Sequence, residues 1–132
     1  MSEFRVLKFG GTSLGNIERI KQVAEYLSTE DKYKKSKLVV VVSAMSGETN
    51  RLISLIKEVR DEPHPMYYDL AISAGEQVSS ALVSTAFQNH GLKALPMLAF
   101  QAGIITSDDF SSARIEAINT SKIKKASVNI SQ

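Results

Sequence analysis

The residues best suited to chemistry lie near the start of the chain, where an apolar run ends in a lysine-containing segment followed by glycines and hydroxyl side chains. These residues are Lys8, Gly10, Gly11, Thr12 and Ser13. Paired glycines let backbone N–H groups approach a ligand without a Cβ in the way. The lysine adds a point charge, and a helix that follows would direct the positive end of its dipole to the same place. The pattern favours a phosphate-binding loop after a strand, although an ordinary strand-to-helix turn that needs glycine for close packing would use similar residues.

Two well-known phosphate-binding loops do not fit this segment. A P-loop ends in Gly-Lys-Ser or Gly-Lys-Thr, whereas Asn16 follows Gly15 here. The dinucleotide-binding fingerprint needs a glycine at the position of Thr12 and an acidic residue at the end of the next strand, where Ser43 stands. A loop in which the lysine precedes the glycines therefore differs from both of these phosphate-binding loops.

Composition argues against several other functions. With 132 residues, of which 43% are hydrophobic, the chain has room for one globular domain with one core. The net charge is only +2, and we expect the basic cluster within residues 32–37 to be a solvated loop rather than a nucleic-acid site. The chain has no cysteine, and its histidines, His64 and His90, are far apart, which argues against disulfides and a zinc site.

Targeting signals are also missing from the sequence as it stands. No signal peptide precedes Phe4, and the longest apolar run, residues 38–42, is too short to cross a bilayer. We therefore expect a cytoplasmic protein with no membrane partner.

Hydrophobic periodicity predicts alternating strands and helices in the first half of the chain. After Gly15, apolar residues at helical spacing predict an amphipathic helix, with Asn16 as its N-cap. The branched run over residues 38–42 is typical of a strand buried on both faces of a parallel sheet. A small-residue loop follows over residues 43–50, and a second helical stripe ends at the turn of residues 62–65.

The second half of the chain begins with a long helical pattern. It covers residues 66–90, is interrupted at Gly75, and is closed by Gly91 as a C-cap. Short strands are predicted over residues 93–99, 104–106 and 113–118, and Pro96 makes the first of these irregular or an edge strand. This order of elements predicts an α/β fold, with ligand-binding loops at the carboxyl ends of the strands.

Four short strings, in order and spacing, resemble those of the aspartate kinases of the amino acid kinase superfamily. They are Lys8-Phe9-Gly10-Gly11-Thr12-Ser13, Val42-Ser43-Ala44-Met45-Ser46-Gly47-Glu48-Thr49-Asn50, Ser73-Ala74-Gly75-Glu76 and Gln101-Ala102-Gly103-Ile104. The resemblance covers Phe4 to about Lys125. Glutamate 5-kinase, acetylglutamate kinase and uridylate kinase share the lysine–glycine start, but they do not share the loop over residues 43–50 in this form.

The resemblance implies a three-layer α/β/α sandwich with a mainly parallel sheet. It also implies phosphoryl transfer from ATP to the side-chain carboxylate of L-aspartate, the first step toward lysine, threonine and methionine. By the same resemblance, Lys8 is the catalytic residue that stabilises charge on the transferring phosphoryl group. The expected ATP- and phosphate-binding residues are Lys8, Phe9, Gly10, Gly11, Thr12, Ser13 and Ser43. The expected aspartate-binding residues are Ser43, Thr49 and Glu76. Magnesium is expected to be held mainly by the nucleotide, with no metal ligands from the chain.

Each of these polar residues also has a purely structural explanation. Ser43 and Thr49 could cap the helix that starts near Asn50. Glu76 could be a first-turn partner for the dipole of a helix that begins after Gly75.

The chain is shorter than the catalytic domains that it resembles. We expect residues 1–126 to form the N-terminal portion of an amino acid kinase domain and residues 127–132 to be a polar tail. The later glycine-rich segment with its substrate-binding arginine, the adenine pocket and the ACT domains of the family have no counterpart here, and neither Arg51 nor Arg114 lies in a matching motif. We therefore expect the isolated chain to be inactive and to form a homo-oligomer. The alternative is a non-catalytic, kinase-like half-domain that acts as a binding or oligomerisation module.

Overall fold

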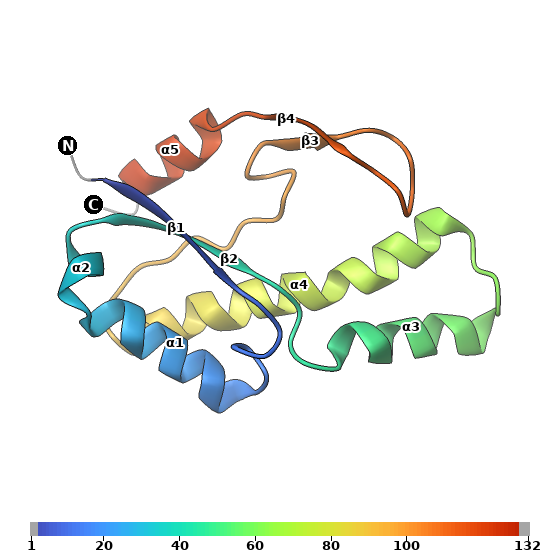
Figure 1. The fold of residues 1–132 in the computed structure, drawn as a ribbon, viewed down its shortest axis with the longest axis horizontal. Helices are drawn as coiled ribbons and strands as arrows, with labels where there is room; N and C mark the ends of the chain where they lie inside the picture. The colour runs from blue at the N-terminus through green and yellow to red at the C-terminus, as the bar shows by residue number, and fades with distance from the viewer. Residues whose placement is uncertain (1–2, 130–132) are drawn as a thin grey trace.

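Two parallel strands lie at the centre of the fold in a computed structural model that describes residues 3–129 (Figure 1). Strand β1 (Phe4–Phe9) pairs with strand β2 (Lys37–Val42) along its whole length. Helix α1 (Ile17–Thr29) and the one-turn helix α2 (Asp31–Lys34) connect them. Parallel strands need such a crossover because a tight hairpin would make them antiparallel. The predicted α/β class is confirmed.

Helix α1 begins where the sequence predicts. The backbone of Asn16 is extended, and its side-chain oxygen accepts a hydrogen bond of 2.9 Å from the N–H of Arg19. Ile20, Ala24 and Leu27 are buried at helical spacing. The predicted amphipathic helix and its N-cap are confirmed.

The basic segment after α1 contains a helical turn, so the prediction of a loop is wrong over residues 31–34. The ammonium of Lys32 donates a hydrogen bond of 2.9 Å to the hydroxyl of Tyr26 and lies 4.8 Å from the centre of the Tyr33 ring. The two tyrosine rings meet edge to face, with their centres 5.7 Å apart. Lys32 is nevertheless exposed, as expected for a surface cluster.

The core lies between one face of the sheet and helices α1 and α4 (Pro65–Gln88). Its buried members are Leu14, Ile20, Ala24, Leu27, Val83, Ala86 and Phe87. The strand residues that pack against them are Leu7, Phe9, Leu38, Val40 and Val42. On the opposite face of the sheet, Val6 is 69% exposed and Val41 is 44% exposed. The prediction that β2 is buried on both faces is therefore wrong for the described residues, because α1 and α4 pack on one face.

Helix α3 (Glu48–Val59) and helix α4 run beside each other, and α4 continues along the sheet (Figure 1). α4 is one continuous helix through Gly75, so the predicted interruption is wrong. Within residues 3–129, no helix combines the length and the apolar character that crossing a membrane requires.

Helix α4 ends at Gln88 with Asn89 as its C-cap, so the predicted C-cap at Gly91 is wrong by two residues, although Gly91 closes the turn that follows. Gly91 has φ +68°, and its N–H donates to the carbonyl of Gln88 at 3.1 Å. The N–H of Leu92 donates to the carbonyl of Phe87 at 3.2 Å. This pair of hydrogen bonds around a left-handed residue is a Schellman motif, which glycine favours because it has no Cβ.

The segment after α4 differs from the prediction. Residues 93–99 contain no strand, because Pro96 has no N–H to donate and the described chain provides no neighbouring strand for this segment. Strand β3 (Ile104–Thr106) is confirmed, and it pairs antiparallel with strand β4 (Ile115–Ile118). β4 begins at Ile115 rather than at residue 113.

A helix that the sequence analysis missed follows this pair. Helix α5 (Ser121–Asn129) begins just after Asn119, whose side-chain oxygen accepts hydrogen bonds from the N–H of Ser121 at 3.1 Å and from its hydroxyl at 2.7 Å. Of the predicted polar tail, residues 127–129 belong to α5, and residues 130–132 lie outside the described residues.

Candidate active site

The two small-residue loops predicted to bind ligand leave the sheet side by side. β1 and β2 end opposite each other, and the N–H of Ser43 donates to the carbonyl of Phe9 at 3.2 Å just beyond the last paired residues. The N–H of Leu14 then donates to the carbonyl of Gly10 at 3.2 Å, which closes the first loop into a turn before α1. Ser43 therefore lies next to the glycine loop, as expected for loops at the carboxyl edge of a parallel pair.

The two adjacent glycines have different structural roles in this loop. A Cβ on Gly11 would lie 3.3 Å from the carbonyl oxygen of Ala44 and 3.8 Å from the backbone nitrogen of Ser46, so Gly11 serves close packing between the loops. A Cβ on Gly10 would meet no atom within 4 Å. The space beside the backbone of Gly10 is therefore open to an approaching group.

The polar side chains of the first loop face solvent. Lys8 is exposed on the face of β1 that carries no helix, and its ammonium has no hydrogen bond or ion pair with any residue in the described range. Thr12 is exposed and Ser13 is half-buried. Phe9 differs, because its side chain packs against the core and leaves only main-chain atoms to contact a ligand.

Helix α4 approaches the second loop closely at Gly75. A Cβ on Gly75 would lie 2.9 Å from the Cβ of Ala44, 3.4 Å from the Cγ of Glu48 and 3.5 Å from the Cδ1 of Leu52. Any side chain here would force the helix away from the loop and from α3. The requirement for glycine is therefore one of packing, and it brings Glu76, the next residue, close to the start of α3.

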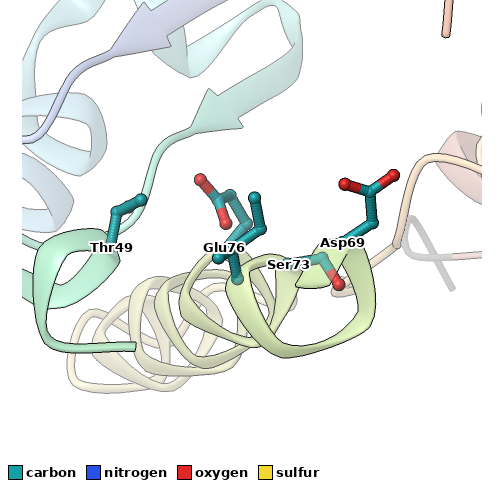
Figure 2. Close-up of a pocket in the computed structure, with 5 residues that line it drawn as sticks. Thr49, Asp69, Ser73 and Glu76 are labelled. Carbon is teal, nitrogen blue, oxygen red and sulfur yellow. The ribbon is translucent and has the colours of Figure 1, made fainter. Parts of the chain in front are cut away.

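A shallow pocket of about 310 Å³ lies where the start of α3 faces α4 (Figure 2). Its lining residues are Thr49, Asp69, Ile72, Ser73 and Glu76. The four that come from α4 lie at positions i, i+3, i+4 and i+7 counted from Asp69, which puts them on one face of the helix. The carboxyl groups of Asp69 and Glu76 rise from the same side of α4 (Figure 2).

The structure brings together Thr49 and Glu76, two of the three residues predicted to share a ligand, whereas the third, Ser43, is not among the residues that line this pocket. Glu76 is exposed, and its carboxylate has no hydrogen bond or ion pair within residues 3–129. The sequence analysis missed Asp69 and Ser73. The signal that could have found them is their helical spacing from Glu76, because positions seven and three residues earlier share its face.

The structural explanations for these side chains are wrong. The N-cap of α3 is Gly47, with φ +78° and no side-chain cap, so neither Ser43 nor Thr49 caps that helix. Glu76 lies in the middle of α4 and cannot be a first-turn partner of a helix dipole.

An ion pair lies at the start of α3, beside the pocket. Arg51 donates to the carboxylate of Glu48 through Nε at 2.9 Å and Nη2 at 2.7 Å. These hydrogen bonds lower the pKa of the Glu48 carboxyl and raise the pKa of the Arg51 guanidinium. The carboxylate of Glu48 is therefore engaged with Arg51. Within residues 3–129, no three His, Asp or Glu side chains come together as a metal site.

Comparisons with known proteins identify the family. The chain matches the model of the amino acid kinase family over residues 3–129. It is 47% identical over 119 residues to the aspartate kinase of Pseudomonas putida, a match that covers 90% of this chain and 29% of that protein. The structure of aspartate kinase from Synechocystis matches with a TM-score of 0.72 and 39% identity, over 79% of this chain and 18% of that one.

A third comparison supports the fold alone. The structure of E. coli aspartokinase III in complex with aspartate and ADP matches with a TM-score of 0.69 at 17% identity, over 97% of this chain and 37% of that one. The resemblance to aspartate kinases stated from the four strings is confirmed, and the chain spans about 29% of the length of the curated relatives that it matches. By the match to the family model over nearly all of its length, the chain belongs to the amino acid kinase family.

Proposed function

We propose that this chain supplies the phosphate-binding loop and the aspartate pocket of an aspartate kinase. The observation that carries the proposal is the contact of Gly75 with Ala44, because it sets the Thr49–Glu76 pocket beside the loops that end β1 and β2. Identity of 47% to the aspartate kinase of Pseudomonas putida supports the same activity. The chain spans 29% of that relative, so the activity of the whole relative is a proposal here.

In the proposed reaction, an oxygen of the aspartate side-chain carboxylate attacks the γ-phosphorus of ATP. A bond forms between that oxygen and phosphorus, the bond from phosphorus to the bridging oxygen of ADP breaks, and the products are aspartyl phosphate and ADP. The attacking carboxylate is already ionised at neutral pH, since the pKa of an aspartate side chain is about 3.9, and no general base is needed. The work of the protein is positioning and charge stabilisation.

Each residue then has a defined task. Lys8 stabilises negative charge on the transferring phosphoryl group, and the backbone N–H groups at Gly10 and Gly11 bind phosphate oxygens. Glu76 accepts hydrogen bonds from the ammonium of aspartate, and Thr49 offers a hydroxyl to the same substrate from across the pocket. Magnesium bound to ATP would neutralise charge on the β- and γ-phosphates.

Phe9, Thr12, Ser13 and Ser43 complete the proposed phosphate site. Phe9 takes part through its main chain, since its partly buried side chain packs against the core. Ser43 directly follows β2 and its N–H donates to the carbonyl of Phe9, and we assign its hydroxyl to either the phosphate or the aspartate. Because the reaction uses ATP, we propose the cytoplasm as its compartment.

An assay of product formation tests this function. The assay uses the polypeptide as the organism makes it, incubated with ATP, magnesium and L-aspartate. A coupled assay follows ADP release, and aspartyl phosphate is trapped as its hydroxamate. We expect aspartate-dependent ADP release that matches hydroxamate formation, and little release with L-glutamate. ADP release that does not depend on aspartate would contradict the proposal.

One observation favours a second candidate, a module that associates with copies of itself. The helix-free face of the sheet exposes apolar side chains of Phe4 (39%), Val6 (69%) and Val41 (44%), and soluble proteins usually cover such faces. A polypeptide of residues 1–132 alone is expected to be a dimer or larger and to release no ADP above background. Light scattering and the coupled assay check this, and a monomer that phosphorylates aspartate would contradict it.

A further inference from the structure

The turn between β3 and β4 is attached to α4 beside the pocket. The carboxylate of Asp69 accepts hydrogen bonds from the N–H of Ser111 at 2.6 Å and from the hydroxyl of Ser111 at 3.0 Å. The two residues are 42 positions apart in the sequence. Figure 1 shows the tip of the β3–β4 loop, residues 107–114, reaching the first turns of α4.

Little else in the described structure ties this loop to the rest of the chain. All residues from 108 to 120 are exposed, so burial does not fix the position of the loop. Its other hydrogen bonds within residues 3–129, such as those from Ser107 to Arg114 and from Ser112 to Asp109, stay inside the loop. The two hydrogen bonds to Asp69 therefore set where the loop lies.

The backbone of Ser111 supports this interpretation. Ser111 has φ +62°, and it is the one residue other than glycine with positive φ in the part of the chain that the structure describes. That conformation is uncommon for a residue with a Cβ and persists where surrounding contacts hold it. Here both hydrogen-bond donors of Ser111 meet the same carboxylate.

Asp69 also lines the pocket with Thr49 and Glu76. Ser111 donates a hydrogen bond to each oxygen of Asp69. Glu76, on the same face of α4, has no such partner within the described range. Two free carboxylates here would compete for one substrate ammonium and repel the carboxylates of aspartate. Engagement by Ser111 thus leaves one acceptor for the ammonium.

We propose that Asp69 is a positioning residue, which holds the β3–β4 loop as the outer wall of the aspartate pocket through Ser111. The proposal rests on the proposed function, since the pocket is the one assigned to aspartate. Loss of the Asp69–Ser111 contact should weaken the binding of aspartate and should leave the handling of ATP unchanged.

The first experiment tests the Asp69–Ser111 contact without an activity assay. Hydrogen exchange is followed by mass spectrometry on peptides that cover the β3–β4 loop, in the polypeptide as the organism makes it. Asp69→Ala should speed exchange at this loop by roughly tenfold or more, because the N–H of Ser111 loses its acceptor. Asp109→Ala is the matched control, since it removes an exposed acid from the same loop and should leave exchange within about twofold of wild type. Equal exchange in all three proteins would overturn the contact.

The second experiment separates positioning from direct contact with substrate. Ser111→Pro removes the N–H and the hydroxyl and excludes positive φ, so it breaks the contact from the loop side without changing any of the α3 and α4 residues that line the pocket. Asp69→Ala and Ser111→Pro should each raise the KM for aspartate by about tenfold, with kcat and the KM for ATP within about threefold of wild type. The double variant should resemble the single ones. Ser111→Gly keeps the N–H and tolerates positive φ, so it should remain close to wild type.

Three results would overturn the positioning role. If Asp69→Ala raises the KM for aspartate and Ser111→Pro does not, Asp69 contacts the substrate directly. If both variants speed exchange but leave that KM unchanged, the loop is not a wall of the pocket. A wild-type protein with slow exchange at the loop but no aspartate-dependent turnover would overturn the proposed function, and with it the role at the pocket, while the contact itself would stand.

Discussion

Gly75 and Ala44 touch so closely that a Cβ on Gly75 would lie 2.9 Å from the Cβ of Ala44. Helix α4 therefore runs so near to the loop after β2 that position 75 has no room for a side chain. This contact joins the helix that carries Glu76 to the loop that lies against Gly11 through the Ala44 carbonyl. The geometry of the candidate site depends on it.

Gly75→Ala should destabilise the protein. Replacing glycine by alanine inside a helix usually gains about 1 kcal/mol, but forcing a methyl group into a filled space costs ~1–3 kcal/mol, and a separation of 2.9 Å places this site at the upper end. Urea denaturation should show a lower free energy of unfolding. The variant Ala44→Gly/Gly75→Ala removes the overlap and should recover much of the loss. A single variant as stable as wild type would contradict the packing role.

Lys8→Ala should slow the proposed reaction without unfolding the protein. Lys8 is exposed and has no partner within residues 3–129, so its removal costs little stability. Loss of a charge that acts on the transferring phosphoryl group should cost about 2–4 kcal/mol of transition-state stabilisation. Steady-state kinetics should therefore show kcat/KM lowered by about 30-fold to 1,000-fold. Lys21→Ala, on the exposed side of α1, is the control, and near wild-type turnover in Lys8→Ala would remove Lys8 from the mechanism.

Glu76→Gln should weaken the binding of aspartate selectively. The substitution keeps the size of the side chain and removes the charge that would pair with the substrate ammonium. Calorimetric titration should show weaker binding of aspartate and nearly unchanged binding of ATP. Equal weakening of both ligands would mean that Glu76 has a structural role instead.

The Glu48–Arg51 pair should give a small dependence of stability on pH. Arg51 lowers the pKa of Glu48 from 4.5, so the folded state holds this carboxylate in its charged form more strongly than the unfolded state. The contribution is present above pH 4.5 and is lost as the pH falls below that value through the lowered pKa of the folded protein. Because the pair is solvent-accessible, salt should weaken the effect. Glu48→Gln should flatten this part of a stability–pH curve measured by urea denaturation, and an unchanged curve would contradict the assignment.

Local signals in the sequence were enough to predict the positions of several elements in the first half of the fold. The N-cap at Asn16, the apolar stripe of α1 and the branched run of β2 each act over a few residues, and each is found as predicted in position. The Schellman motif at Gly91 is equally local. Such elements depend on nearby backbone hydrogen bonds and on the spacing of apolar side chains.

Features that depend on distant partners were mispredicted or missed. The segment over residues 93–99 has the composition of a strand, but a strand needs a neighbour to pair with, which the described chain does not offer it. Gly75 was interpreted as a break because glycine disfavours helices, and only its contact with Ala44 explains why it is inside one.

Some residues of the candidate site could likewise be predicted from local sequence, and others could not. Thr49 and Glu76 could be proposed from family-like strings, and the structure places both on one pocket. Helical spacing from Glu76 could have placed Asp69 on the same face of the helix, but its contact with Ser111 could not be predicted, because the two residues are 42 positions apart. The roles proposed for Lys8 and for the glycine loop stay predictions until they are measured.

The parallel pairing of β1 with β2 also has a consequence for the order of folding. These strands cannot meet as a local hairpin, because the chain must first pass through α1 and α2. Pairing them requires closing a long loop, and that entropy is lost before the ladder forms. Helix α1 has its own N-cap and begins with contacts along its own sequence, so it can form earlier and shorten the distance between the strands. During refolding, amide protons of α1 should therefore become protected before those of the sheet, and the pocket between α3 and α4 should assemble only after α4 has docked.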